Sequence, residues 1–387
     1  MIKKSLLALT LGGLAIGMTE FTMMGLLEEF ARDLNISIPS AGHYISIYAL
    51  GVVIGAPLLV VLTSKMAPKK ILMLFMLMFT IFNGLFVFAP DNNTLLLARF
   101  MAGLPHGAYF GVGAVVASQL ASKGKEAQAI ATMFTGLTLA NLIGVPIGTF
   151  IGQHFSWRVT FFIISLFGLV TLYATHRWIP NLAPKSNMSM RHQLSFFARK
   201  EAWLLIAIIS IGTGGLFAWI SYIAPLMTQE TGISERHVPF IMILVGLGML
   251  FGNIFGGRLA DRVAPTKAAI GAFISMAICL LLVYLSAGNV FLAYLMSFIT
   301  GFGAFIISAP LQMMLIGNAR GSETIAAATG QACFNIGNAL GAFLGGLPMV
   351  FGLSFKAPSL VGMVMALCGA ALSVWFLKML ARRPLVD

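Results

Sequence analysis

The stretch Gly246–Lys267, GLGMLFGNIFGGRLADRVAPTK, runs from an apolar, glycine-rich segment into a short charged turn. A related stretch lies 197 residues earlier, at Ala49–Lys70, ALGVVIGAPLLVVLTSKMAPKK. Seven of the 22 aligned positions are identical: Leu50/Leu247, Gly51/Gly248, Gly55/Gly252, Leu62/Leu259, Ala67/Ala264, Pro68/Pro265 and Lys70/Lys267. The same shift pairs Asn141, Gly144 and Gly148 with Asn338, Gly341 and Gly345. Apolar, glycine-rich sequence matches itself easily, but one offset serves two separated blocks. We therefore interpret the chain as two copies of one unit.

The composition indicates that the chain lies in lipid. Hydrophobic residues make up 59% of the 387 residues and charged residues 9%, against about 25% charged in an ordinary soluble domain. The three cysteines, Cys279, Cys333 and Cys368, lie in apolar runs without the spacing of metal ligands, so neither a disulfide framework nor a metal site is predicted.

Apolar segments of about the length that crosses a bilayer recur along the chain. Because backbone groups in lipid must be paired within the segment, we expect helices. The predicted fold is an all-α polytopic membrane protein with twelve transmembrane helices in two pseudo-symmetric six-helix bundles. The bundles are expected at 1–176 and 201–387, joined by a basic cytoplasmic linker at 177–200. The predicted spans are 5–27, 41–63, 70–89, 94–117, 127–151, 156–176, 201–226, 237–257, 267–287, 290–313, 324–348 and 357–379.

The placement of lysine and arginine predicts the orientation, since cytoplasmic loops carry the excess of these residues. With the N-terminus inside, nineteen of them fall on the cytoplasmic side, and four, Arg32, Arg158, Arg236 and Lys356, fall outside. We therefore expect both termini in the cytoplasm. The net charge of +12 then indicates contact with anionic lipid rather than with nucleic acid. The first segment follows Lys3 and Lys4 as a signal peptide would, but it is long and contains Glu20, so we expect it to be retained.

Two full charges lie well inside the predicted helices. These are Glu20 in the first and Arg99 in the fourth, both in the outer half of the bilayer. A charge there is costly and should face the protein interior or a watery cavity. We interpret the pair as a proton-coupling site, with a static ion pair and direct substrate contact as alternatives. His106, seven residues after Arg99 on the same face, could carry a proton, contact substrate, or simply pack with a hydrogen bond.

Polar side chains at helical spacing predict a helix face that contacts substrate. Gln331, Asn335 and Asn338 place three amides on one side of the eleventh segment. That face should line a central cavity or bond a neighbouring helix, because an amide facing lipid would be costly. Further candidates for substrate contact are Asn141, the repeat partner of Asn338, and the amphipathic aromatics Tyr109, Trp219 and Tyr222, although an aromatic residue of this kind is more often part of the core than of a site.

Several positions are candidates for conformational roles. Gly144 and Gly148 form a small-residue stripe in the fifth segment, and Pro146 between them removes a backbone donor and should bend the helix. The stripe predicts close packing, a hinge, or both. The turns Ser64-Lys65 and Asp261-Arg262 lie at the inner ends of the second and eighth segments, where they can cap helices and hold headgroups. No nucleophile–base pair, metal cluster or Walker lysine occurs, so neither an enzyme nor an ATP-driven pump is predicted.

These residues together resemble the major facilitator superfamily. GGRLADRVAPTK (256–267) is similar to its loop motif after helix eight, and VLTSKMAPKK (61–70) to a diverged copy after helix two. LLLARFMAGLPHGAYFGVG (95–113) resembles the helix-four motif of the drug:proton antiporter group, and NLIGVPIGTFIG (141–152) its helix-five antiporter motif. GMTEFTMMGLL (17–27) and HFSWRVTFF (154–162) match further patterns of the same group. Within it, the chain looks closest to the bacterial arabinose and sugar-efflux permeases.

The resemblance implies two six-helix bundles around a central cavity and proton-driven export, with Glu20 coupling to protons and Arg99 assisting. One departure concerns the first loop motif, where Ser64 and Lys65 replace an Asp followed by an Arg. A hydroxyl can cap a helix, but it cannot form the charge pair thought to latch the outward-open form in this family.

The sequence thus predicts an antiporter in the bacterial inner membrane that uses the proton gradient and no cofactor, and the resemblance implies a monomer. Its substrate would be a sugar, such as arabinose, or an amphiphilic drug. An importer or facilitator, or a membrane sensor that binds without transport, are the alternatives.

Overall fold

The computed structural model describes residues 4–63, 65–122, 126–182, 195–319 and 323–381, and these residues form helices and turns without a strand. The chain divides into two compact units. Unit 1 comprises Met1–Asn187 with Ser234–Ile243, and unit 2 comprises Met188–Ile233 with Leu244–Asp387. The bundle limits at 176 and 201 stay predictions.

Unit 1 contains eight α-helices, one π-helical turn, one 3-10 turn and the start of a further helix within its described residues. They are α1 (Lys4–Gly25), α2 (Leu27–Asp33), α3 (Ile38–Thr63), α4 (Pro68–Phe88), α5 (Asn92–Leu120), α6 (Glu126–Leu139), the π turn η1 (Ala140–Gly144), α7 (Val145–His154), α8 (Trp157–Trp178), the 3-10 turn η4 (Glu235–His237) and the first residues of α12 (Val238–Arg262).

Unit 2 contains the rest of α12 and the elements of the second half of the chain. They are η2 (Ser195–Ala198), α10 (Lys200–Ile220), α11 (Ile223–Pro225), η3 (Leu226–Glu230), α13 (Pro265–Ser286), α14 (Val290–Phe305), α15 (Ser308–Gly317), α16 (Glu323–Val350) and α17 (Ala357–Ala381).

Twelve spans in the described part of the chain are long and apolar enough to cross a membrane. The predicted all-α class and the number of spans are therefore confirmed. Four predicted spans are less regular than their hydropathy suggests. The first ends at Gly25 and restarts as α2, the fifth contains the π turn η1 between α6 and α7, the seventh ends at Ile220 before a turn, and the tenth breaks between α14 and α15, ahead of Pro310.

Local sequence explains where several helices begin. Asp91 accepts hydrogen bonds from the backbone N–H groups of Asn93 and Thr94 and so caps α5. Ser156 caps α8 and Asn289 caps α14 in the same way. Side-chain oxygens at these positions satisfy donors that the first helical turn leaves unpaired.

Glycines allow the backbones within each unit to approach closely. In unit 1, Gly51 and Gly55 of α3 lie against backbone carbonyl oxygens of α5, and Gly103 of α5 lies against the carbonyl oxygen of Tyr48. In unit 2, Gly248 and Gly252 of α12 lie against carbonyl oxygens of α14, and Gly301 of α14 lies against that of Val245. The repeat found in the sequence therefore corresponds to the same backbone contact made once in each unit.

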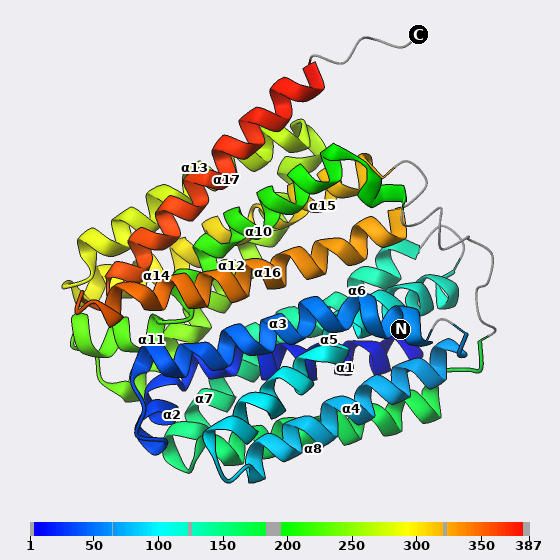
Figure 1. Cartoon of the computed structure of the whole chain (residues 1–387), viewed down its shortest axis with the longest axis horizontal. Coiled ribbons are helices and arrows are strands. Elements are labelled where there is room, and N and C mark those ends of the chain that lie inside the picture. Colours follow the sequence, from blue (N-terminus) through cyan, green and yellow to red (C-terminus); the bar gives the residue numbers. More distant parts are fainter. Residues whose placement is uncertain (1–3, 64, 123–125, 183–194, 320–322, 382–387) are drawn as a thin grey trace. The chain divides into compact units, whose positions relative to one another are not determined.

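Other helix pairs complete each unit. In unit 1, α1 packs on α6 and α4 on α8, and in unit 2, α10 packs on α16 and α17 (Figure 1). Three polar side chains of α1 and α5, those of Glu20, Arg99 and His106, are buried in this unit.

Replacing Gly252 with alanine should destabilise the protein. The new methyl group would meet the backbone carbonyl of Phe302, which no rotamer change can move. We expect a loss of about 1–3 kcal/mol, typical of overpacking, measured as a lower melting temperature of the purified protein.

Gly257→Ala on the same helix is the matched control, because a methyl group there would meet open space. That variant should be neutral or slightly stabilising, since alanine is the better helix former. Equal melting temperatures for the two variants would contradict the close packing of α12 on α14.

Candidate functional site

Unit 1 contains three titratable side chains in one buried group. Glu20 of α1 is 5% exposed, and Arg99 and His106 of α5 are 0% and 2% exposed. The Nε2 atom of His106 lies 4.0 Å from Oε2 of Glu20. The structure therefore brings together the residues that the sequence predicts for proton coupling.

Tyr48 of α3 joins this group, although it is not among the residues predicted from the sequence. Its hydroxyl lies 3.1 Å from Nδ1 of His106, and the guanidinium carbon of Arg99 lies 4.4 Å from the centre of its ring. A neutral imidazole that accepts from Tyr48 at Nδ1 carries its proton on Nε2, the nitrogen that faces Glu20. The available signal was a pair of tyrosines, Tyr44 and Tyr48, spaced by one helical turn in an apolar segment.

Arg99 is held by hydrogen bonds to α1 and by aromatic rings. Its Nη1 atom donates to the carbonyl and hydroxyl oxygens of Thr19, each at 3.2 Å. The Thr19 hydroxyl in turn donates to Oδ1 of Asn83 at 2.6 Å. Phe86 and Phe161 add ring faces 5.4 Å from the guanidinium carbon, which stabilise a desolvated cation.

Two donor atoms of this buried arginine remain available. Nε and Nη2 of Arg99 make no hydrogen bond to any described group. Unsatisfied donors of a buried cation are costly, so their presence beside Glu20 and His106 marks a site with an unused hydrogen-bonding capacity. A planar guanidinium of this kind binds a carboxylate through two parallel hydrogen bonds.

The other predicted polar residues of unit 1 lie along the packing of α1. Tyr109 is fully buried, and its ring occupies the space that a side chain at Gly12 would need. Asn141 lies in the π turn, where its Nδ2 donates to the carbonyl oxygen of Leu137 at 3.1 Å. Their assignment to substrate contact stays a prediction.

The predicted polar residues of unit 2 gather on α16 and α10. Asn335 and Asn338 are buried, and Nδ2 of Asn335 donates to the carbonyl oxygen of Gln331 at 3.0 Å. The Tyr222 hydroxyl donates to the carbonyl oxygen of Ala342 at 2.7 Å, which ties the end of α10 to α16. A substrate role for these residues stays a prediction, while Tyr222 has an evident packing role.

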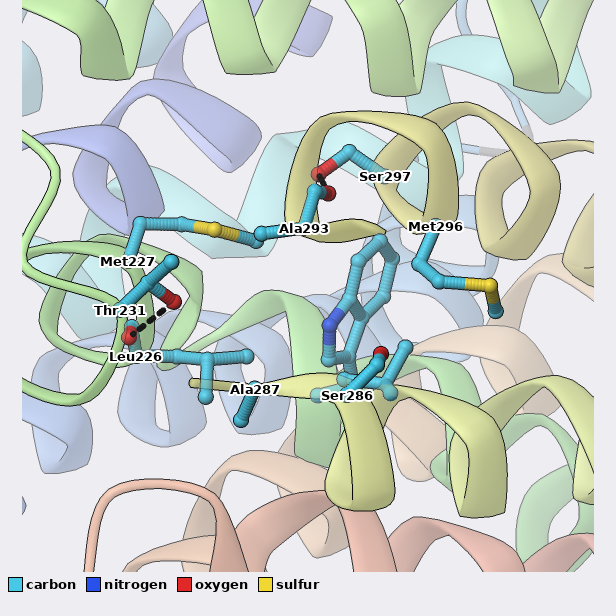
Figure 2. A pocket seen from close by; sticks show the side chains of 10 residues that line it. Leu226, Met227, Thr231, Ser286, Ala287, Ala293, Met296 and Ser297 are labelled. Carbon is cyan, nitrogen blue, oxygen red and sulfur yellow. Dashed lines mark hydrogen bonds between the residues drawn. The ribbon is translucent and has the colours of Figure 1, made fainter. Parts of the chain in front are cut away.

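Trp219 of α10 borders a pocket of about 10 Å³. Figure 2 shows how Met227, Met296, Thr231 and Ser297 lie around it, with the hydroxyls of the last two bonded to backbone carbonyls. A pocket of this size holds about one water molecule. It is therefore too small to be the substrate site.

The predicted conformational residues lie at helix ends and in the π turn. Gly144 contacts Met18, Gly148 contacts Thr22 and Thr160, and Pro146 begins α7 directly after the π turn. Lys65 and Arg262 are exposed. Ser64 and the side chain of Asp261 lie outside the described residues.

A second polar group, formed by Asp33, Trp157 and Arg158, lies at one end of unit 1. The sequence did not predict that these residues come together. The Trp157 indole donates to Oδ2 of Asp33 at 2.8 Å. Arg158 stacks over that indole and donates from Nη1 to the carbonyl oxygen of Val87 at 2.6 Å. The HFSWRVTFF motif thus binds the ends of α2, α4 and α8 together.

Glu29 of α2 lies one helical turn before Asp33, a member of this second group, and the pKa of its carboxyl is shifted. Burial raises the pKa of its carboxyl from 4.5 to about 7, although a hydrogen bond from the backbone and one from Gln153 act in the opposite direction. Beside it, Arg32 pairs with Glu235 at 2.6 Å. That exposed ion pair contributes little to stability. The charges of Arg32, Glu235 and Glu28 nevertheless act on the carboxyl group of Glu29.

No group of three histidine, cysteine or acidic residues within the described ranges is arranged to hold a metal ion. The chemistry available at the Glu20 group is proton transfer and ion pairing.

Comparison with known proteins decides the family. The profile of the Major Facilitator Superfamily matches residues 9–341 and also residues 207–386. The chain belongs to the major facilitator superfamily. As a member of this superfamily it is a multi-pass transporter of small solutes and not an enzyme.

Relatives in the superfamily extend over almost the whole chain. It is 41% identical over 355 residues to the putative transporter AraJ of Escherichia coli K12, covering 92% of this chain and 90% of that protein. It is 36% identical over 377 residues to the inner membrane transport protein YdhP of the same strain, covering 97% and 96%. An uncharacterized MFS-type transporter of Bacillus subtilis, YtbD, is 36% identical over 348 residues, covering 89% and 88%.

Solved structures of the superfamily share the fold. A D-xylose–proton symporter superposes with a TM-score of 0.76 at 17% identity, covering 96% of this chain and 97% of that one. A bacterial homologue of the human lysosomal transporter Spinster superposes with a TM-score of 0.69 at 16% identity, covering 99% and 98%.

The pKa of Glu29 predicts a pH-dependent effect of Glu29→Gln. Ionisation of Glu29 opposes the folded state, because its pKa is about 7 there, against an ordinary value of 4.5. The resulting destabilisation is absent below pH 4.5, grows up to pH 7, and is constant above. Glu29→Gln should therefore melt at a higher temperature than wild type at pH 8, by the equivalent of roughly 2–3 kcal/mol.

The advantage of Glu29→Gln should shrink as the pH falls toward 5 and disappear near pH 4, where the carboxyl of Glu29 is mostly neutral in the unfolded chain as well as in the folded protein. Glu29→Asp keeps the carboxyl group and serves as the control, which should follow the wild-type dependence on pH. An identical shift of the melting temperature at pH 8 and near pH 4 would contradict the raised pKa.

Proposed function

We propose that this transporter is a proton-coupled antiporter that exports a small organic molecule across the bacterial inner membrane. In this proposal both termini lie in the cytoplasm and the protein works as a monomer, without a cofactor or a metal ion. The inner membrane location is supported by the name of YdhP, an inner membrane transport protein. The excess of lysine and arginine on one side of the predicted spans supports the orientation.

One observation carries the proposal: the buried carboxyl group of Glu20 lies within 4.0 Å of an imidazole and in the same cluster as a buried guanidinium. An acid in this setting has two stable forms. Ionised, it is attracted to Arg99 and can accept a strong, charge-assisted hydrogen bond from His106; protonated, it loses the charge attraction and accepts only a weaker hydrogen bond. Intramembrane ionisable residues of this kind commonly mark proton pathways.

The proposed cycle uses the two unpaired donors of Arg99. While Glu20 is ionised, its carboxylate can exchange between Nε2 of His106 and the guanidinium fork. A proton taken up from the outside neutralises Glu20 and weakens the connection between α1 and α5. This change shifts the protein between its two states only if protonated and ionised Glu20 favour them differently, and the substrate must bias the same equilibrium in the opposite direction.

The substrate class in this proposal is a sugar such as arabinose or an amphiphilic drug. The amides at Gln331, Asn335 and Asn338 would suit hydroxyl groups, and the 23 methionines would suit an adaptable apolar wall. A proton-coupled importer would use the same titrating group, and the fold neighbour named as a D-xylose–proton symporter is a proton-coupled protein. The direction of the coupled flux therefore distinguishes the two.

Glu20→Gln should separate exchange from driven transport. Proteoliposomes are loaded with arabinose or with a cationic dye, and a pH gradient is imposed across their membrane. Wild type should move substrate against the flow of protons, whereas Glu20→Gln should lose at least about tenfold in gradient-driven flux, a loss expected for a missing proton-transfer group. Without a gradient, the variant should still exchange labelled for unlabelled substrate.

Glu230→Gln is the matched control, because Glu230 lies in unit 2, where it accepts a backbone hydrogen bond from Phe355. It should keep gradient-driven transport. Full gradient-driven transport by Glu20→Gln would refute the role of Glu20. If wild type moved substrate in the same direction as protons, the protein would be a proton-coupled importer and not an antiporter.

A further inference from the structure

An apolar groove runs along unit 1 between α1, α7 and α8, away from the Glu20 group. Its volume is about 240 Å³. Leu14 and Met18 of α1 line it on one side, and Ile163 and Phe167 of α8 line it on another. The one hydroxyl in its described lining belongs to Thr160, and that hydroxyl already donates to the carbonyl oxygen of Gly148 at 2.8 Å. The side chains of the groove are therefore poorly suited to a sugar.

The backbone before α7 is not a regular helix where it lines the groove. In the π turn, the N–H of Val145 donates to the carbonyl of Ala140, five residues earlier, and Pro146 has no N–H to restore the α-helical pattern. Gly144 and Gly148 line the same stretch, and a methyl group at either would meet Met18 or the threonines Thr22 and Thr160, so they bring this segment close to its neighbours. The π turn and the proline make the backbone beside the groove irregular.

One side of the groove is exposed, within a segment long and apolar enough to span the membrane. Ile143 and Ile147, which line it, are 50% and 51% exposed and lie in the span Ala129–His154. Apolar cavities exclude water, and an unfilled groove would deprive its lining of dispersion contacts. The neighbouring material at this depth is lipid acyl chain, and the groove, at about 240 Å³ against about 10 Å³ for the pocket beside Trp219, is large enough for a run of methylene groups.

We propose that this groove binds one acyl chain of a membrane phospholipid. Met18, with its flexible thioether, adapts the floor to the chain. The bound chain supports the irregular segment between α6 and α7 by supplying the contacts that a regular helix would make itself. The proposal stands apart from proton coupling, since no residue of the Glu20 group lines the groove.

A pulse–chase cross-linking experiment tests the proposal. The transporter is reconstituted with phosphatidylethanolamine that carries a photoactivatable diazirine in one acyl chain, then diluted into a large excess of unlabelled lipid and irradiated at increasing times. Adducts are located by peptide mass spectrometry. We expect adducts on groove residues to outlast those on Leu166, an exposed residue of α8 outside the groove lining.

Ile163→Trp fills the groove and should abolish the long-lived adduct, whereas Leu166→Trp adds similar bulk on the same helix and should preserve it. Ile147→Trp is a second filling variant, and both are compared only after their melting temperatures show that they are folded. Loss of groove adducts as fast as those at Leu166 would overturn the proposal, as would an unchanged long-lived adduct in both filling variants.

Discussion

A charged side chain inside a lipid-embedded bundle must find partners that replace water. Arg99 determines much of unit 1 for this reason. Thr19 supplies two oxygens, Asn83 orients Thr19, and aromatic rings from α3, α4 and α8 surround the guanidinium. Parts of four helices of unit 1, α1, α3, α4 and α8, thus surround a single cation. Glu20 and His106, which could exchange a proton, belong to the same buried group.

Glycine makes that arrangement possible. The α3 and α5 backbones meet through Gly51, Gly55 and Gly103, and this contact places Tyr48 against the face of α5 that carries Arg99 and His106. Unit 2 repeats the same glycine contact between α12 and α14. Tyr48 corresponds to Val245 under the shift of 197, and Arg99 corresponds to Ser297 under the shift of 198 that relates the glycine contacts of α5 to those of α14. The duplicated backbone therefore carries a buried charge in one copy and uncharged residues in the other.

The sequence predicted the helical class, the twelve spans and the repeat, because hydropathy and a constant offset report on these directly. It also selected Glu20, Arg99 and His106, because a full or partial charge in an apolar segment is conspicuous. Tyr48, Thr19 and Asn83 were missed, since an uncharged polar residue in a membrane helix looks the same whether it bonds its own backbone or a buried charge. The π turn before Pro146 and the breaks at Gly25 and after Phe305 depend on tertiary packing, which a local hydropathy pattern does not contain. Glu29 was not singled out from the sequence, because nothing in its neighbours along the chain reveals that folding partly buries its carboxyl group.

The central claim is that Glu20 gains and loses a proton within the folded transporter. Infrared difference spectroscopy of the purified protein across a pH series observes this directly, through the carbonyl stretch of a protonated carboxylic acid. A band that fades as the pH rises, and that is missing in Glu20→Gln but present in Glu29→Gln, is the result we predict. A spectrum in which Glu20→Gln removes no titrating carboxyl band at any pH would contradict proton exchange at Glu20.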